Sequence, residues 1–272
     1  MSTITTSISA PRTSQRVSLG IAAQDTFAIT GRNLLTIMRL PQLLVFSTIQ
    51  PIIFVLMFRY VFGGAVQIPG LTVPYVDYLM PGIFVQTVAF GATNTAIGLA
   101  EDVHKGLIER FRSLPMARSA VLAGRTVADL VRDAFVVALM IVVGFIVGFR
   151  IHAGVMAFLG GMLVLLLFAF ALAWVFALIG LSAPTAETAQ AAGFPILAIL
   201  VFASSAFVST ATMPDWLAWF ADHQPLSITV NAVRACCIGG ETASWVIKSI
   251  LWSIGIIVVF APIAVRRYRR VA

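Results

Sequence analysis

The sequence predicts an all-α integral membrane protein with six transmembrane helices and both termini in the cytoplasm. Of its 272 residues, 60% are hydrophobic and only 11% are charged, and the mean hydropathy is +0.98. Soluble domains carry about 25% charged residues, so this chain has too few polar groups to cover a water-exposed surface. Its apolar stretches are about 20 residues long, which favours helices, since the strands of membrane barrels alternate with a period of two.

Six apolar stretches are long enough for a helix to cross the hydrocarbon layer, which takes about 20 residues. The second and fifth stretches carry more polar residues than the others, and each contains a proline, Pro81 and Pro195. An even number of spans places both termini on one side. The predicted spans are residues 43–62, 78–99, 126–149, 155–180, 191–212 and 245–265.

The positions of Lys and Arg predict the orientation. Of the 18 basic residues, 14 lie before the first span, from the second span to the start of the third helix, or after the sixth span. Short cytoplasmic segments are enriched in Lys and Arg. We therefore expect both termini and the loop at 100–125 in the cytoplasm, and the segment at 213–244 outside.

The N-terminal segment predicts a tail followed by a surface helix. Residues 1–23 are rich in Ser and Thr and contain no acid, which indicates a disordered cytoplasmic tail, although mitochondrial transit peptides share this composition. Residues 24–40 predict an amphipathic interfacial helix with Arg32 and Arg39 on its polar side. It is either a membrane anchor or a strut against a cytoplasmic partner. Residues 266–272 form a basic cytoplasmic tail.

The loop at 100–125 contains the most polar stretch of the chain. Glu101 and Lys105 have the favourable i,i+4 spacing of a helical ion pair. A solvated loop would explain the charges. It would not explain the apolar residues that alternate with them, such as Ile108 and Phe111. A segment that docks on another protein accounts for both.

The external segment at 213–244 predicts two short helices. Trp216 and Trp219 suit a helix at the membrane–water interface, where indole rings are favoured. The following stretch, Leu226 to Ile238, is apolar but too short to span, which favours a re-entrant helix that returns to the outer face.

The sequence contains no motif for catalysis or for a cofactor. No Gly-Lys pair occurs, so the chain lacks the phosphate-binding loop of ATPases. His104, His152 and His223 lie far apart, and the adjacent Cys236 and Cys237 have no partners at metal-ligand spacing. We expect neither a catalytic residue nor a cofactor in this chain. Because membrane orientation explains the positive charge, we also expect no nucleic acid partner.

One pair of carboxylates supports an alternative function. Asp129 and Asp133 are four residues apart and share a helix face, a spacing that suits a Mg²⁺ site in a membrane-embedded lipid transferase. The competing interpretation is that they form ion pairs within the helix, Arg125–Asp129 and Asp129–Arg132.

Polar residues within two spans indicate either helix–helix hydrogen bonds or a wettable cavity. We expect each group to form a stripe on its helix. Apart from residues near the span ends, such as Arg59, whose side chain can extend outward, we expect no acid or base deep inside a span. This disfavours an ion- or proton-coupled transporter. A channel-like protein remains a third hypothesis. The candidate pathway-lining residues are Gln86, Thr93 and Asn94 in the second span, and Ser204, Ser205 and Ser209 in the fifth.

Several short motifs resemble the membrane subunit of type-2 ABC exporters, and within them the daunorubicin-resistance permease group. The resemblance covers nearly the whole chain and is most specific between residues 106 and 118. One departure is His223-Gln224-Pro225, where the group has Asn before the proline. The matching motifs are Arg39-x-Pro41, Phe62-Gly63-Gly64, Tyr78-Leu79-Met80-Pro81-Gly82, Arg110-Phe111-Arg112-Ser113-Leu114-Pro115, Gly148-Phe149-Arg150 and Met213-Pro214-x-Trp216.

The resemblance implies a transport subunit of a bacterial plasma membrane that is not itself an enzyme. It implies a separate ABC ATPase subunit that binds ATP and Mg²⁺, a second permease chain, identical or related, and an amphipathic drug or lipid as cargo. It also implies that the interfacial helix and the loop contact the ATPase. The candidate ATPase-coupling residues are Arg32, Arg39, Glu101, Asp102, Gly106, Arg110, Phe111, Arg112, Leu114, Pro115 and Arg118.

Overall fold

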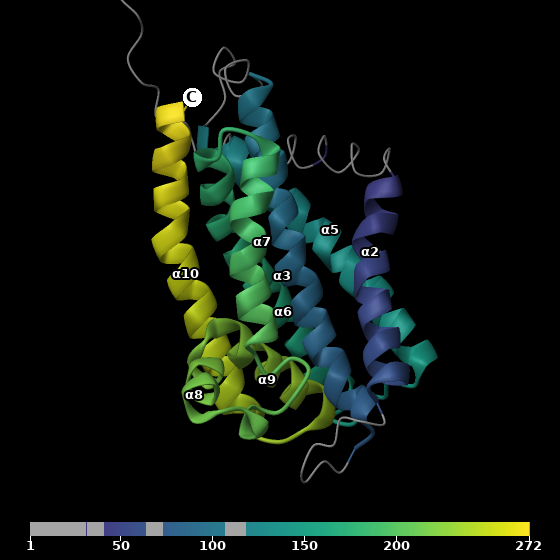
Figure 1. Cartoon of the computed structure of the whole chain (residues 1–272). Coiled ribbons are helices and arrows are strands. Elements are labelled where there is room, and N and C mark those ends of the chain that lie inside the picture. The colour runs from purple at the N-terminus through teal and green to yellow at the C-terminus, as the bar shows by residue number, and fades with distance from the viewer. Residues whose placement is uncertain (1–30, 32–40, 64–72, 107–117, 272) are drawn as a thin grey trace, which may run out of the picture.

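A computed structural model describes residues 31, 41–63, 73–106 and 118–271 of the chain. Within these ranges the chain forms helices joined by short connections, with no strand, as the sequence predicts (Figure 1). The predicted interfacial helix at 24–40, including Arg32 and Arg39, lies outside the described residues.

Six long helices form a bundle, and short helices close one end of it. The short elements are η2 (Thr210–Thr212), α8 (Asp215–His223) and α9 (Pro225–Ile238). The long helices are α2 (Pro41–Leu56), which the π-helical turn η1 (Met57–Val61) extends, α3 (Tyr75–His104), α5 (Arg118–Val147), α6 (Val155–Ser182), α7 (Ala186–Phe202) and α10 (Thr242–Val271).

The two ends of the bundle differ. At one end, which we call the loop end, α3 finishes at His104 and α10 finishes near the C-terminus (Figure 1). At the opposite end, which we call the cap end, lie α8 and α9 (Figure 1). The cap end therefore contains the two short helices that the sequence predicts between the fifth and sixth spans.

Within the described ranges, four segments are long and apolar enough to cross a membrane: α3, Leu122–Val147 of α5, α6, and Thr242–Arg270 of α10. Three further apolar helices are shorter: Thr48–Val61, Ala186–Phe202 and Pro225–Ile238. Large apolar side chains such as Ile146 and Leu251 are exposed on the outside of the bundle. Exposed apolar surface on this scale is expected where lipid, rather than water, surrounds the protein. The described residues thus form a multi-pass membrane protein.

The predicted fifth span is wrong in its second half. The helix α7 ends at Phe202, whereas we expected it to continue to residue 212. Ser204, Ser205 and Ser209 therefore form no helical stripe, because they lie in the turns that follow. Side-chain hydrogen bonds stabilise these turns: Ser204 Oγ donates to the carbonyl of Val201, and its oxygen accepts the backbone N–H of Ala206. A hydropathy profile does not take account of hydrogen bonds between side chains and the helix backbone, so it does not indicate that the helix ends here.

Helix α3 forms the centre of the bundle and is buried over most of its length. It approaches α6 closely at Gly180, where an added Cβ atom would lie 2.4 Å from the carbonyl oxygen of Ala96. A glycine is required there because the contact is with backbone, which cannot rotate aside.

Replacing Gly180 with Ala is expected to destabilise the chain by about 1–3 kcal/mol, because the two helices must separate to admit the methyl group. Gly255 on α10 is a matched control, since no atom lies within 4 Å of its added Cβ. Gly255→Ala should be neutral or stabilising. Thermal unfolding in detergent gives the melting temperatures of both variants. Equal melting temperatures for Gly180→Ala and Gly255→Ala would contradict the close α3–α6 contact.

Candidate functional site

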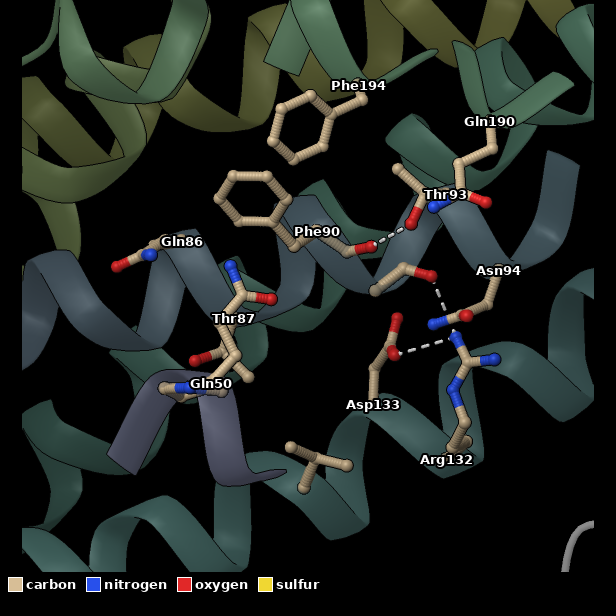
Figure 2. Close-up of a pocket in the computed structure, with 13 residues that line it drawn as sticks. Gln50, Gln86, Thr87, Phe90, Thr93, Asn94, Arg132, Asp133, Gln190 and Phe194 are labelled. Carbon is tan, nitrogen blue, oxygen red and sulfur yellow. Dashed lines mark hydrogen bonds and ion pairs between the residues drawn. The ribbon is translucent and has the colours of Figure 1, made fainter. Parts of the chain in front are cut away.

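A cavity of about 300 Å³ lies between α2, α3, α5 and α7 (Figure 2). The walls combine amides, hydroxyls and one ion pair with two aromatic rings. This volume is at the lower end of the range for small-molecule sites. The principal lining residues are Gln50 of α2; Gln86, Thr87, Phe90, Thr93 and Asn94 of α3; Arg132 and Asp133 of α5; and Gln190 and Phe194 of α7.

Helix α3 contributes the largest part of the wall. Residues four and seven apart share a helix face, and this spacing places Gln86, Phe90 and Thr93 on the cavity side. The three residues that we expected on this stripe, Gln86, Thr93 and Asn94, all line the cavity. The ring of Phe90 meets the ring of Phe194 with centroids 5.9 Å apart, which closes the wall between α3 and α7.

The cavity contains hydrogen-bond acceptors without a donor. Gln86 is only 1% exposed, and its Oε1 atom has no hydrogen-bond partner among the described residues. Thr87 and Thr93 donate their hydroxyl protons to the carbonyls of Ile83 and Phe90, at 2.7 and 2.6 Å. Their oxygen atoms keep lone pairs free. A polar molecule in the cavity can therefore donate hydrogen bonds to these two hydroxyl oxygens, whereas Gln86 Oε1 has almost no accessible surface.

An ion-pair cluster connects α5 to α3 beside the cavity. Arg132 donates to Asp133 Oδ1 at 3.1 Å and to the carbonyl of Gly91 at 3.0 Å (Figure 2). It also donates to Asp129 Oδ1 at 3.1 Å. Thr95 of α3 donates to Asp129 Oδ2 at 2.6 Å. A side chain at Gly91 would displace the Asp133 carboxylate, since an added Cβ would lie 2.6 Å from Asp133 Oδ1.

This cluster decides between the two interpretations of Asp129 and Asp133. The Asp129–Arg132 ion pair is confirmed, but the predicted Arg125–Asp129 pair is wrong, because Arg125 pairs with Asp102 of α3 instead. Each carboxylate has at least one oxygen bound to Arg132, and the described residues contain no group of three or more metal-ligating side chains. The geometry thus favours ion pairing over a Mg²⁺ site.

At the loop end, side chains hold the end of α3 against the start of α5. Asp102 and Arg125 form a partly buried ion pair across the two helices. Gly98 makes room for it, because an added Cβ would overlap the guanidinium of Arg125. The two ends of the loop that leaves α3 are therefore fixed relative to each other.

The remaining described coupling candidates lie at the end of α3 or at the start of α5. Glu101 pairs with Lys105 at 2.7 Å, and this hydrogen bond raises the pKa of the Lys105 amine. Gly106 has a φ of 66°, which favours glycine and turns the chain out of the helix. Arg118 begins α5, and its side chain is not described. The other coupling candidates, Arg110, Phe111, Arg112, Leu114 and Pro115, lie outside the described residues.

The polar contacts form a continuous seam between α3 and α5. On α3 the seam runs through Gly91, Thr95, Gly98 and Asp102, which recur every three or four residues and share one face. These positions span about 16 Å of helix. The seam therefore joins the cavity wall at Arg132 to the base of the loop.

The sequence did not predict the charged groups at the cap end. Arg234 of α9 is only 7% exposed and lies over the Tyr78 ring, with its Cζ 3.6 Å from the centroid. Asp77, which is 1% exposed, accepts the backbone N–H of Arg150 at 2.8 Å and contacts His152 Nε2 at 2.7 Å. Asp77 lies in the first turn of α3, just before the predicted second span, so it does not contradict our expectation that acids and bases occur only near span ends. Because Asp77 lies near the end of an apolar run, the sequence pattern alone does not indicate that its side chain is buried.

The three serine candidates are not at the main cavity. Ser205 and Ser209 line a separate cavity of about 300 Å³ at the cap end, together with Asn231 and Arg234. Ser205 Oγ donates to Asn231 Oδ1 at 3.0 Å, which ties the chain after α7 to α9. Ser204 lines neither of these two cavities.

Comparison with known proteins identifies the family. Residues 24–237 match the family described as ABC-2 type transporter. The chain is 34% identical over 256 residues to the daunorubicin resistance ABC transporter permease protein DrrB1 of Streptomyces coeruleorubidus, covering 94% of this chain and 89% of that protein. It is 29% identical over 259 residues to the doxorubicin resistance ABC transporter permease protein DrrB of Mycobacterium tuberculosis, covering 85% and 87%. The chain therefore belongs to the ABC-2 type transporter family and is similar to its drug-resistance permeases.

Proposed function

We propose that the chain is the permease subunit of an ATP-driven exporter. It moves an amphipathic drug, a lipid or a similar hydrophobic metabolite out of the cytoplasm or the inner leaflet. A separate ABC ATPase supplies the energy, and the permeases of this family normally work with such a subunit. The observation that carries the proposal is the seam between α3 and α5, which joins a polar cavity within the bundle to the base of the predicted coupling loop.

In this proposal all six long helices cross a bacterial plasma membrane. Although α2 with η1 and α7 are shorter than the other four, they lie beside them in the bundle (Figure 1). The loop end faces the cytoplasm, since four arginines (Arg266, Arg267, Arg269 and Arg270) crowd the end of α10. The cap end faces outward, with exposed Trp216 and Trp219 at the lipid–water boundary.

The loop between α3 and α5 is the proposed contact with the ATPase. Its apolar residues and its arginines suit a cleft on a soluble partner, and the Asp102–Arg125 pair makes α3 and α5 move together when the loop is pushed. The interfacial helix at 24–40 adds a second contact. ATP and Mg²⁺ bind to the partner, and this chain holds no cofactor of its own.

The cavity is the proposed cargo site. Its polar wall lies inside a bundle whose outer surface is apolar, so a head group can enter it while an apolar body stays near lipid. A second permease chain, identical or related, completes the transporter.

The loop is tested by co-purification. The triple variant Arg110→Ala, Phe111→Ala and Arg112→Ala should reduce recovery of the co-expressed ATPase at least tenfold while the chain still inserts into the membrane. Lys248→Ala is the matched control, because it removes an exposed charge at the cap end. If the triple variant recovers as much ATPase as the control does, the loop is not the docking site.

A further inference from the structure

We propose that the cavity at Arg234, at the cap end, holds the head group of a resident phospholipid with a primary amine, such as phosphatidylethanolamine. Arg234 binds the phosphate, Glu241 binds the ammonium group, and the acyl chains lie along α10. This lipid is a bound component of the fold and not the cargo, since its site is separate from the cavity between α2, α3, α5 and α7. The inference goes beyond the proposed export function and does not depend on it.

The first support is the charge of Arg234. This side chain is only 7% exposed, and its acceptors are three backbone carbonyls and the amide oxygen of Asn231, so no carboxylate among the described residues neutralises it. Because a buried charge is costly without a counter-charge, an anion that enters the cavity is favoured. Arginine binds phosphate through strong, charge-assisted hydrogen bonds.

The second support is a set of unused donors on the side chains that line this cavity. A guanidinium has five N–H groups, and the four acceptors of Arg234 in the described chain leave at least one of them over. The Oδ1 atom of Asn231 accepts from Ser205 and Arg234, whereas its amide N–H groups donate to no described residue. Ser209 Oγ accepts the backbone N–H of Ala211, and no described residue accepts its hydroxyl proton. Donors from three side chains suit a phosphate, whose oxygens accept.

The third support is an acid that lines the same cavity. Glu241 is exposed and forms no ion pair with Arg234 or with another cation in the described part of the chain. This carboxylate opposes a simple anion, whereas a zwitterionic head group places its phosphate at Arg234 and its ammonium group at Glu241. A primary ammonium has three N–H donors, and the trimethylated amine of a choline head group has none.

The fourth support is an apolar groove that continues from the site, where α9 lies beside α10 (Figure 1). The cavity at Arg234 adjoins a second cavity of about 670 Å³, whose charged side chains Asp222 and Lys248 are opposite in sign. This second cavity shares Leu251 and Trp252 with a groove of about 460 Å³, which only apolar and aromatic side chains of α10 line. A path therefore leads from the polar site to the lipid-facing surface of α10. The lining residues common to the first two cavities are Thr210, Asn231 and Trp245.

Lipid retention tests the site directly. We would exchange the purified full-length chain into mixed micelles with equal amounts of dioleoyl phosphatidylethanolamine and dioleoyl phosphatidylglycerol, and measure the bound lipid by native mass spectrometry. The two lipids share the phosphate and the chains and differ in the amine. The chain should retain at least about fivefold more phosphatidylethanolamine, because hydrogen bonds between charged groups are the strong ones. Equal retention of the two lipids, or retention of neither, would overturn the proposal.

Three variants locate the contacts without disturbing the hydrogen bonds of Arg234. Glu241→Gln should reduce the preference to within about twofold. Asp222→Asn makes the same charge change in the neighbouring cavity and should keep most of the preference. Val259→Trp fills the groove on α10 and should lower the retention of both lipids without changing their ratio. An equal loss of preference from Asp222→Asn would overturn the assignment to Glu241.

The soluble head group separates a lipid site from a site for a free ligand. Glycerophosphoethanolamine carries the same phosphate and amine without acyl chains, and at a concentration equal to that of the lipid it should leave the lipid bound. Displacement would overturn the assignment to a lipid. These measurements need no ATPase, so their failure leaves the export proposal standing, and a failure of the ATPase to co-purify leaves the lipid site standing.

Discussion

Replacing Arg234 with Met is expected to lower the melting temperature of the chain by roughly 10 °C. The Arg234 guanidinium donates to the carbonyls of Tyr78, Ser205 and Ala206 at 3.1, 2.7 and 3.3 Å, and to Asn231 Oδ1 at 2.9 Å. It thereby joins α9 to the start of α3 and to the chain after α7. Buried acceptors left without a donor cost about 1–3 kcal/mol each, and 1 kcal/mol shifts the melting temperature of a chain of this size by about 2–4 °C.

Two controls separate this role from a general effect of charge. Lys248→Met removes an exposed cation at the same end of the bundle and should change the melting temperature by less than about 2 °C. Arg234→Lys keeps the charge but not the planar fork, so it should recover only part of the loss. If Arg234→Met melts at the temperature of the wild type in thermal unfolding, Arg234 does not hold the cap end together.

The second large effect is expected at Arg132. Replacing it with Met leaves Asp129 and Asp133 buried one helical turn apart without their counter-charge. Removing one partner from a buried ion pair costs about 3–5 kcal/mol, and here two carboxylates lose the same partner. We expect the variant to unfold at a melting temperature roughly 10 °C lower, with α3 and α5 no longer tied at Gly91.

Removing the whole cluster should be tolerated far better than removing one member. The triple variant Asp129→Asn, Arg132→Met and Asp133→Asn has no buried charge at this position, so we expect it to recover most of the lost stability. Thermal unfolding of the single and triple variants side by side makes the comparison. If the triple variant is no more stable than Arg132→Met, the loss does not come from unpaired charge.

Apolar runs predict most of the helices in this chain, because a helix in lipid satisfies its own backbone hydrogen bonds. The runs at 155–180 and 245–265 lie within α6 and α10, and the motif at 78–82 lies near the start of α3. Hydropathy fails where side chains compete with the helix, as Ser204 does after α7.

The polar contacts were harder to predict, for a different physical reason. Helical spacing identifies partners three or four residues apart, and it correctly pairs Asp129 with Arg132. It also assigns Arg125 to Asp129, whereas Arg125 reaches Asp102 on another helix. Such a pair depends on which helices become neighbours and on the space left at Gly98. A single sequence does not specify that arrangement.

The central claim is that a separate ATPase drives transport through this chain. The most direct test reconstitutes the chain and its ATPase in proteoliposomes and measures ATP-dependent movement of a fluorescent amphipathic drug across the bilayer. The matched sample contains an ATPase that binds ATP but does not hydrolyse it. We predict transport with the active ATPase and none above the protein-free rate with the inactive one. Equal transport with both, or by the chain alone, would contradict the claim and would favour a channel-like protein.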